Sequence, residues 1–149
     1  MKLVLVAAGA LALALPASAQ DTPSRWTLDR TDGPTLAWGN GQEEEPVQIY
    51  SCPHHGVVQV HFNVDHRPRG RTTPVVLASG TTRATATGRS QPEEMYGGAE
   101  ITVSLTAASP VFAAFRRSGR IRLQVGSETV TSGVARTSMV TQFLHDCTN

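Results

Sequence analysis

Two cysteines and three histidines are the first residues in this sequence whose types and spacing suggest chemistry. Cys52 and Cys147 are the only cysteines, His54 and His55 closely follow the first, and His145 precedes the second by two positions. If the cysteines pair, three imidazoles lie near one covalent joint, and imidazole is a good ligand for zinc or copper. One hypothesis is therefore a transition-metal site formed by His54, His55 and His145.

The spacing of these histidines argues against that metal site. Residues two apart on a helix point to nearly opposite sides, so His145 faces away from Cys147 if the C-terminal segment is helical. No HxxxH or HxH pattern accompanies the three residues, although close histidine spacing is typical of many metal sites. We therefore predict no resident metal or other cofactor and keep metal binding as an alternative function.

Arginines form two clusters that suit anion binding. The first lies in the polar segment 65–73 and the second in residues 116–122. Guanidinium groups bind carboxylates and phosphates through two parallel hydrogen bonds. The candidate binding residues are Arg67, Arg69, Arg71, Arg116 and Arg117. A second interpretation stays open, in which the first cluster is an exposed loop and the second offsets the negative end of a helix.

The sequence contains none of the familiar catalytic motifs. A GxSxG elbow, an HExxH pair and a phosphate-binding GxxxxGK[ST] loop are all absent. Glu93 and Glu94 lie in the polar segment 89–98, where burial is not expected to tune their pKa values for catalysis. We therefore predict that the protein is not an enzyme.

Residues 1–19 have the pattern of a secretory signal peptide. Lys2 precedes thirteen apolar residues, Leu3 to Leu15, and Ala17-Ser18-Ala19 forms a small-residue exit before Gln20. A transmembrane helix needs about 20 apolar residues, and no later segment approaches that length. We therefore expect a periplasmic or secreted protein whose mature chain has no transmembrane segment.

Cleavage of this leader leaves a chain with no net charge. Lys2 is the only lysine, so the mature chain carries 12 arginines against 12 acidic residues. Nucleic-acid binding draws on surplus cationic charge, so we expect no nucleic-acid partner, although residues 68–71 resemble an AT-hook core in their order. Export also places Cys52 and Cys147 in an oxidising compartment, where we predict that they form a disulfide.

Alternating hydrophobicity predicts a β-rich fold. Five alternating runs and two shorter candidates are separated by turn residues, and the expected strands are residues 25–28, 36–38, 47–52, 57–64, 74–78, 101–105 and 120–125. Residues 110–118 predict a helix capped by Ser109 and stopped by Gly119, and a second helix begins at Thr137 or Ser138. We predict one domain over residues 20–149: a small disulfide-linked antiparallel β-sandwich or partly open barrel with two short helices, the second C-terminal.

Residues 49–52 and 56–62 resemble the opening of the bacterial periplasmic inhibitors of C-type lysozyme. Those inhibitors are small β-barrels with a cysteine near each end. Residues 78–80, Ala-Ser-Gly, are similar to the inhibitory Ser-Gly segment of that family. The resemblance covers the first strand pair, and the family's aromatic and Lys-Gly signature is missing downstream. It implies inhibition of C-type lysozyme as an alternative function.

The sequence therefore favours an exported, non-enzymatic binding or scaffold module. Rigid β scaffolds commonly carry function on their loops, and the two long loops expected here are residues 65–73 and 89–98. The first is basic and the second acidic. This charge favours an envelope or extracellular protein, or a glycan, over an apolar small molecule as the partner.

Overall fold

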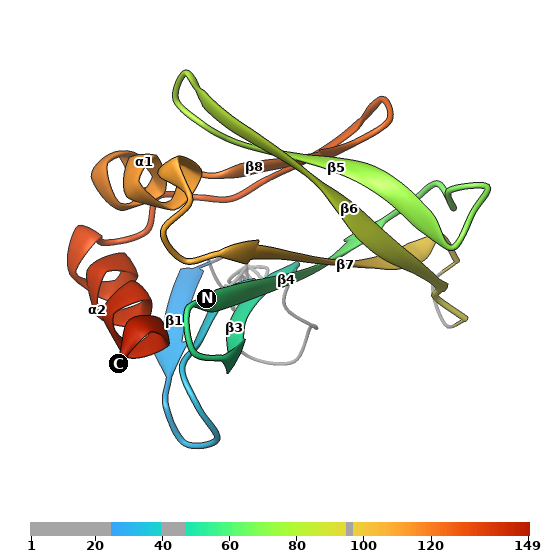
Figure 1. Cartoon of the computed structure of the whole chain (residues 1–149). Coiled ribbons are helices and arrows are strands. Elements are labelled where there is room, and N and C mark those ends of the chain that lie inside the picture. The colour runs from blue at the N-terminus through green and yellow to red at the C-terminus, as the bar shows by residue number, and fades with distance from the viewer. Residues whose placement is uncertain (1–24, 40–46, 95–96) are drawn as a thin grey trace, which may run out of the picture.

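The computed structural model describes residues 25–39, 47–94 and 97–149 (Figure 1). Within these ranges nine strands form one antiparallel sheet, accompanied by two helices, neither of which is long and apolar enough to cross a membrane. The elements are β1 (Arg25–Asp29), β2 (Thr35–Gly39), β3 (Gln48–His54), β4 (Val57–Val64), β5 (Thr72–Ser79), β6 (Thr82–Pro92), β7 (Ala99–Thr106), α1 (Pro110–Ser118), β8 (Arg122–Val125), β9 (Glu128–Thr131) and α2 (Thr137–Thr148). The predicted signal peptide, residues 1–19, lies outside the described residues.

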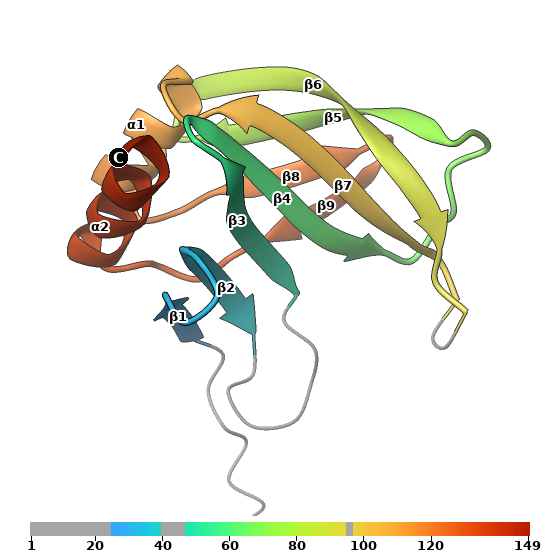
Figure 2. The same cartoon turned by 60° about the horizontal axis from the view of Figure 1, so that its bottom comes forward.

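The sheet is a curled half-barrel rather than a sandwich. Its strand order is β1-β2-β3-β4-β7-β6-β5-β8-β9, and both helices lie at one end of the curl (Figure 2). The predicted class, a mainly β, disulfide-linked antiparallel fold with two short helices, is confirmed. Of its two alternatives, the partly open barrel is the correct one.

β4 shows how the sequence builds this sheet. Val58, Val60, Phe62 and Val64 are buried, and the residues between them are only partly covered. Because side chains alternate between the two faces of a strand, this pattern sends one face of β4 into the core. β4 also pairs along its whole length with β7. The strand predicted at residues 57–64 is therefore confirmed with the same bounds.

β6 corrects the loop predicted at residues 89–98. Thr82 to Pro92 form one strand of 11 residues, so the first four residues of that loop belong to the sheet, and the last two residues of the predicted loop 65–73 begin β5. β6 pairs with β5 from Thr82 to Arg89, but with β7 only from Arg89 to Pro92. The strands β6 and β7 therefore diverge before Arg89, and α1 packs against β5 and β6 on that side (Figure 1).

α1 begins and ends where its sequence predicts, but its cap differs. Gly119 ends the helix with φ 66°, the left-handed conformation expected of it. The predicted capping role of the Ser109 hydroxyl is wrong, because that side chain makes no hydrogen bond to the helix. The backbone N–H of Phe112, which such a cap would occupy, donates instead to the Ser109 carbonyl at 3.0 Å.

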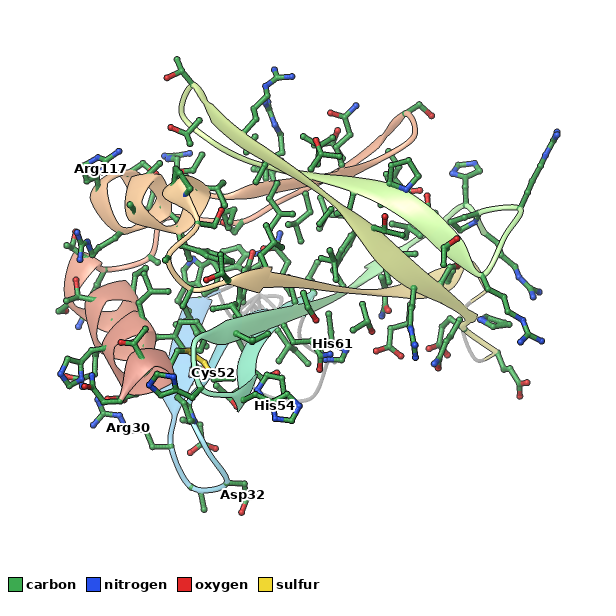
Figure 3. All side chains as sticks on the ribbon, viewed as in Figure 1. Arg30, Asp32, Cys52, His54, His61 and Arg117 are labelled. Atoms are coloured by element: carbon green, nitrogen blue, oxygen red, sulfur yellow. A yellow bond between two sulfur atoms is a disulfide. The ribbon has the colours of Figure 1, made fainter. Side chains whose placement is uncertain are left out.

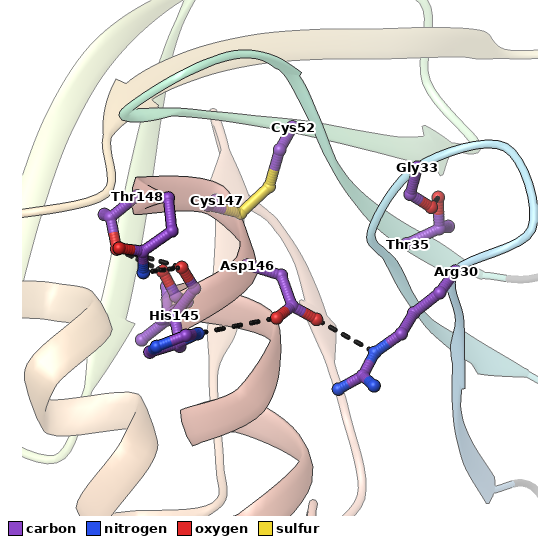
Figure 4. The surroundings of a disulfide bond; sticks show 10 residues. Arg30, Gly33, Thr35, Cys52, His145, Asp146, Cys147 and Thr148 are labelled. Carbon is purple, nitrogen blue, oxygen red and sulfur yellow. Dashed lines mark hydrogen bonds and ion pairs between the residues drawn. A yellow bond between two sulfur atoms is a disulfide. The ribbon is translucent and has the colours of Figure 1, made fainter.

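α2 docks by the apolar stripe that its spacing predicts. Val140, Phe143 and Cys147 are buried, and Met139 and Leu144 pack beside them. The predicted disulfide between Cys52 and Cys147 is confirmed (Figure 4). The two Cα atoms lie 5.4 Å apart, within the usual range for a bridge. The C-terminal helix is thus covalently joined to β3.

Two polar contacts accompany this bridge, and Figure 4 shows the second of them. The backbone N–H of Gly56 donates to the carbonyl of Cys147 at 2.7 Å. The Nε atom of Arg30 lies 2.9 Å from the Asp146 carboxylate and links the β1–β2 hairpin to α2. A hydrogen bond from the Gln142 amide, together with the nearby Arg30 charge, lowers the pKa of Asp146. Asp146 therefore stays ionised and paired over a wider pH range than an isolated carboxyl group.

The two ends of the sheet, β1 and β9, are joined through side chains. Trp26 Nε1 donates to the Gly133 carbonyl at 2.8 Å, just past the end of β9. The fully buried Gln48 donates from Nε2 to the Val130 carbonyl at 3.4 Å and accepts from the Tyr50 hydroxyl at 2.8 Å. Burial raises the pKa of Tyr50 well above its ordinary value. Its hydroxyl therefore keeps the proton that it donates.

Replacing Cys52 and Cys147 together by alanine should strongly destabilise the fold. The bridge spans a sequence separation of 95 residues, and closing such a loop in the unfolded chain is worth about 4–5 kcal/mol in the loop-entropy model. The urea midpoint, followed by circular dichroism and compared with that of the oxidised wild-type chain, should fall clearly. Reduced wild-type protein is the control and should fall by a similar amount. An unchanged midpoint in both samples would contradict the stabilising role of the bridge.

Candidate functional site

A groove lined by arginines lies where the loop between β4 and β5 meets the end of β6. It has a volume of about 850 Å³, and it is lined by Arg67, Pro68, Arg69, Gly70, Arg71, Thr72, Arg89, Ser90, Gln91, Pro92 and Glu94. The structure therefore brings together the three loop arginines that the sequence singled out. It adds Arg89, which sequence reasoning missed. The basic loop and the acidic segment, predicted as separate functional loops, both contribute to this one groove.

Strand pairing places Arg89 beside the basic loop. Thr72 pairs with Arg89 at the start of β5, and the backbone N–H of Ser90 donates to the Arg71 carbonyl at 2.9 Å. The sequence feature that could have revealed the position of Arg89 is the tight turn between Ser79 and Thr82. Counting outward from that turn, one residue on each strand at a time, pairs Thr72 with Arg89.

Glu128 anchors the start of the basic loop from across the sheet. Its carboxylate accepts hydrogen bonds from the backbone N–H groups of Asp65, at 2.7 Å, and His66, at 3.2 Å. Burial raises the pKa of Glu128, but these hydrogen bonds and the nearby His66 outweigh burial and leave the pKa lowered. Because Glu128 begins β9, the loop that carries three of the groove's arginines is held by the last strand of the sheet.

The groove is positively charged. In the part of the chain that the structure describes, none of Arg67, Arg69, Arg71 and Arg89 forms an ion pair with a carboxylate. Glu94 is the acidic residue among the lining residues given above. Arginine stays protonated in proteins and offers five N–H donors. The groove can therefore bind carboxylates or phosphates, but its arginines cannot act as general acids or bases.

His61 forms a polar cluster on the outer face of β4 and β7. Its Nδ1 atom lies 3.1 Å from both Glu100 Oε1 and Thr102 Oγ1, and its Nε2 atom lies 3.1 Å from Gln59 Oε1. In a catalytic triad, the nucleophile and the carboxylate contact different ring nitrogens of the histidine. Here the hydroxyl and the carboxylate share one nitrogen, so the cluster lacks the arrangement of a triad.

The candidate metal ligands His54, His55 and His145 are exposed side chains (Figure 3 labels His54). His145 Nδ1 lies 3.5 Å from Asp146 Oδ1. Among residues 25–39, 47–94 and 97–149, no three His, Cys, Asp or Glu side chains come together in a group that could hold a metal ion. The geometry therefore gives no support to the metal-binding alternative.

Arg116 and Arg117 do not join the groove. Both are exposed in the last turn of α1, at the opposite end of the molecule from the β4–β5 loop (Figure 3 labels Arg117). Cations at that position offset the negative end of a helix. The two arginine clusters are thus separate surfaces, and only the first lines the groove.

Ser79, in the segment similar to the lysozyme inhibitors, is only 2% exposed. Its Oγ lies 2.8 Å from Ser118 Oγ and donates to the Arg120 carbonyl at 2.8 Å. A hydroxyl buried and bonded in this way is not available to a partner. The geometry therefore gives no support to inhibition through this segment.

Comparisons of the chain with models of known families, with curated proteins and with solved structures find no match. The function therefore has to be inferred from the chain's own residues and their geometry.

Glu128→Gln should weaken the anchor of the basic loop and alter the pH dependence of stability. The lowered pKa means that Glu128 stabilises the fold above its unfolded value near 4.5, and that this contribution is lost as the pH falls through the lowered value. The variant should be about 1 kcal/mol less stable than wild type at pH 7, and the difference should shrink toward pH 3. Urea unfolding across this range measures it.

Glu94→Gln is the matched control for that variant. It makes the same chemical change at an exposed residue of the groove, and its urea midpoint at pH 7 should match that of the wild type, since exposed charges contribute little to folding. An equal loss of stability at pH 7 and pH 3 in Glu128→Gln would contradict the anchor.

Proposed function

We propose that this protein is an exported, non-enzymatic binding module whose arginine groove holds an acidic surface of a partner protein. The observation that carries the proposal is the set of four arginines in the 850 Å³ groove, none of them paired with a carboxylate of the described chain. Clustered like charges repel one another. An anionic partner relieves that repulsion and supplies the acceptors that the guanidinium groups lack.

A protein carboxylate surface suits the groove better than a sugar chain. Among the described residues that line it there is no aromatic ring, so these residues offer no flat apolar surface on which a sugar ring could stack. Arginine forks match the geometry of single Asp and Glu carboxylates.

A binding role also fits the chemistry of the groove better than a catalytic one. Its titratable side chains are arginines, which do not exchange protons near neutral pH, and the exposed carboxylate of Glu94. Export fits the disulfide, since such bonds persist in oxidising compartments, and the partner would therefore be an envelope or extracellular protein. The Glu128 carboxylate accepts hydrogen bonds from the backbone at the start of the basic loop. Because the loop is already held there, less conformational entropy is lost when a partner binds.

Reversing three charges in the basic loop should abolish most of this binding. Arg67→Glu, Arg69→Glu and Arg71→Glu combined should weaken the binding of poly-L-glutamate by about tenfold or more, measured by calorimetry at low salt. Added salt should weaken wild-type binding in the same direction. Thermal stability should change little, since exposed loop charges contribute little to folding.

The control combines Arg83→Glu, Arg120→Glu and Arg122→Glu, three exposed arginines outside the groove. It changes the net charge by the same amount and should retain wild-type affinity. Equal losses of affinity in both triple variants would show that binding depends only on the net charge of the protein, and would overturn the proposal. Tighter binding of a polyuronate than of poly-L-glutamate at the arginine groove would overturn the choice of a protein partner.

A further inference from the structure

A second groove, of about 530 Å³, lies where β1 and β2 meet the segment that follows β9. Six of the residues that line it carry its chemistry: Arg25, Trp26, Trp38, Val134, Arg136 and Met139. It shares no residue with the arginine groove. The two grooves therefore differ in composition, since this one combines aromatic rings with cations.

The indole rings are held in place before any ligand arrives. Trp26 donates from Nε1 to the Gly133 carbonyl at 2.8 Å, and its ring centroid lies 5.8 Å from that of Trp38 at an interplanar angle of 43°. The Trp38 ring packs so closely on Gly133 that a Cβ atom there would collide with it. Trp26 is only 7% exposed, whereas Trp38 is partly exposed. Trp38 is therefore the ring offered to a ligand.

Unpaired cations and an exposed apolar side chain lie beside these rings. Arg25 and Arg136 are both exposed, and neither forms an ion pair within the residues that the structure describes. Val134 is 58% exposed and adds an apolar side chain to the lining of the groove. The groove thus presents an apolar surface between two guanidinium groups.

We propose that this groove binds an acidic sugar, such as a uronic acid residue of an oligosaccharide. The C–H face of a pyranose ring packs on an indole, much as other apolar surfaces do, while its hydroxyl groups stay in water. The sugar carboxylate complements Arg25 and Arg136, which bind it through charge-assisted hydrogen bonds. A fatty acyl chain suits the groove less well, because the groove is open to solvent and would leave much of the chain exposed to water.

The placement of the tryptophans makes this site directly observable. The sequence contains two tryptophans, and both line this groove. Intrinsic fluorescence and the two indole N–H signals in a nitrogen–proton NMR spectrum therefore report on this groove and not on the arginine groove.

The test titrates the oxidised, exported chain with tetragalacturonic acid and follows tryptophan emission. We expect a saturable change in emission and a shift of the Trp38 indole signal. Arg25→Gln combined with Arg136→Gln should weaken binding by about tenfold or more, while the emission spectrum of the free variant and its thermal midpoint stay close to wild type. Neutral maltotetraose should produce a much weaker response at the same concentrations.

Two further samples separate this site from the arginine groove. The variant with Arg67→Glu, Arg69→Glu and Arg71→Glu should keep the full fluorescence response to tetragalacturonic acid. Poly-L-glutamate should bind the wild type without changing tryptophan emission. A flat titration, an equal response to maltotetraose, or an unchanged affinity in the Arg25/Arg136 variant would overturn the proposal. Loss of the response in the triple variant would show that the response depends on the arginine groove and would also overturn the proposal.

Discussion

The closure of the curled sheet by side chains is the constraint on which the rest of the structure depends. β1 and β9 stand at the two ends of the strand order. Trp26 of β1 bonds to the segment just after β9, and Gln48 of β3 bonds to Val130 of β9. Gln48 is fully buried, where an unpaired amide would be costly. Its oxygen accepts from Tyr50 and its nitrogen donates to Val130, so the buried polar groups satisfy each other. Leucine in place of Gln48 would bury the Tyr50 hydroxyl without its acceptor.

Aromatic packing and the disulfide make this closure rigid. Trp26 lies 5.4 Å from Phe115 of α1 and 5.7 Å from Tyr50 of β3, measured between ring centroids. One indole of the first strand thus contacts the third strand and the first helix, and donates its N–H to the segment after β9. Cys52 lies on β3, two residues beyond Tyr50, and bonds to α2. The helices therefore hold the curl at the end where β6 and β7 diverge and no longer pair.

The parts of the fold that sequence reasoning predicted are those with a strong local signal. β4 alternates over eight residues, α2 carries an apolar stripe, and two cysteines leave one possible pairing within the chain. β6 has no such signal: its first six residues are threonine, alanine and arginine, and they are partly or fully exposed because the strand leaves the core there. The burial of Gln48 was equally hard to predict from the sequence. This polar residue is 0% exposed, whereas its apolar neighbour Val47 is 44% exposed.

In the candidate site, too, the sequence predicted only the part that is encoded locally. The three loop arginines follow one another along the chain, so their proximity is local. Arg89 joins them through a strand pairing, and Glu128 anchors their loop from 63 residues away. Contacts of that kind depend on how the sheet curls, which no pattern within the basic loop records. The histidines show the limit of closeness along the chain: His54, His55 and His145 lie near the cysteines in sequence, yet among the described residues they form no group that could hold a metal ion.

One short stretch of chain, residues 128–136, supports both grooves. It begins with Glu128, which holds the basic loop, and continues through Val130, which accepts the hydrogen bond from Gln48. It then supplies Gly133, which accepts from Trp26, and ends at Arg136 on the edge of the second groove. The same backbone that closes the sheet therefore sets the positions of both surfaces. It follows that exposed arginines can change in either groove without affecting the other, whereas any substitution that displaces this stretch alters both grooves together with the closure itself.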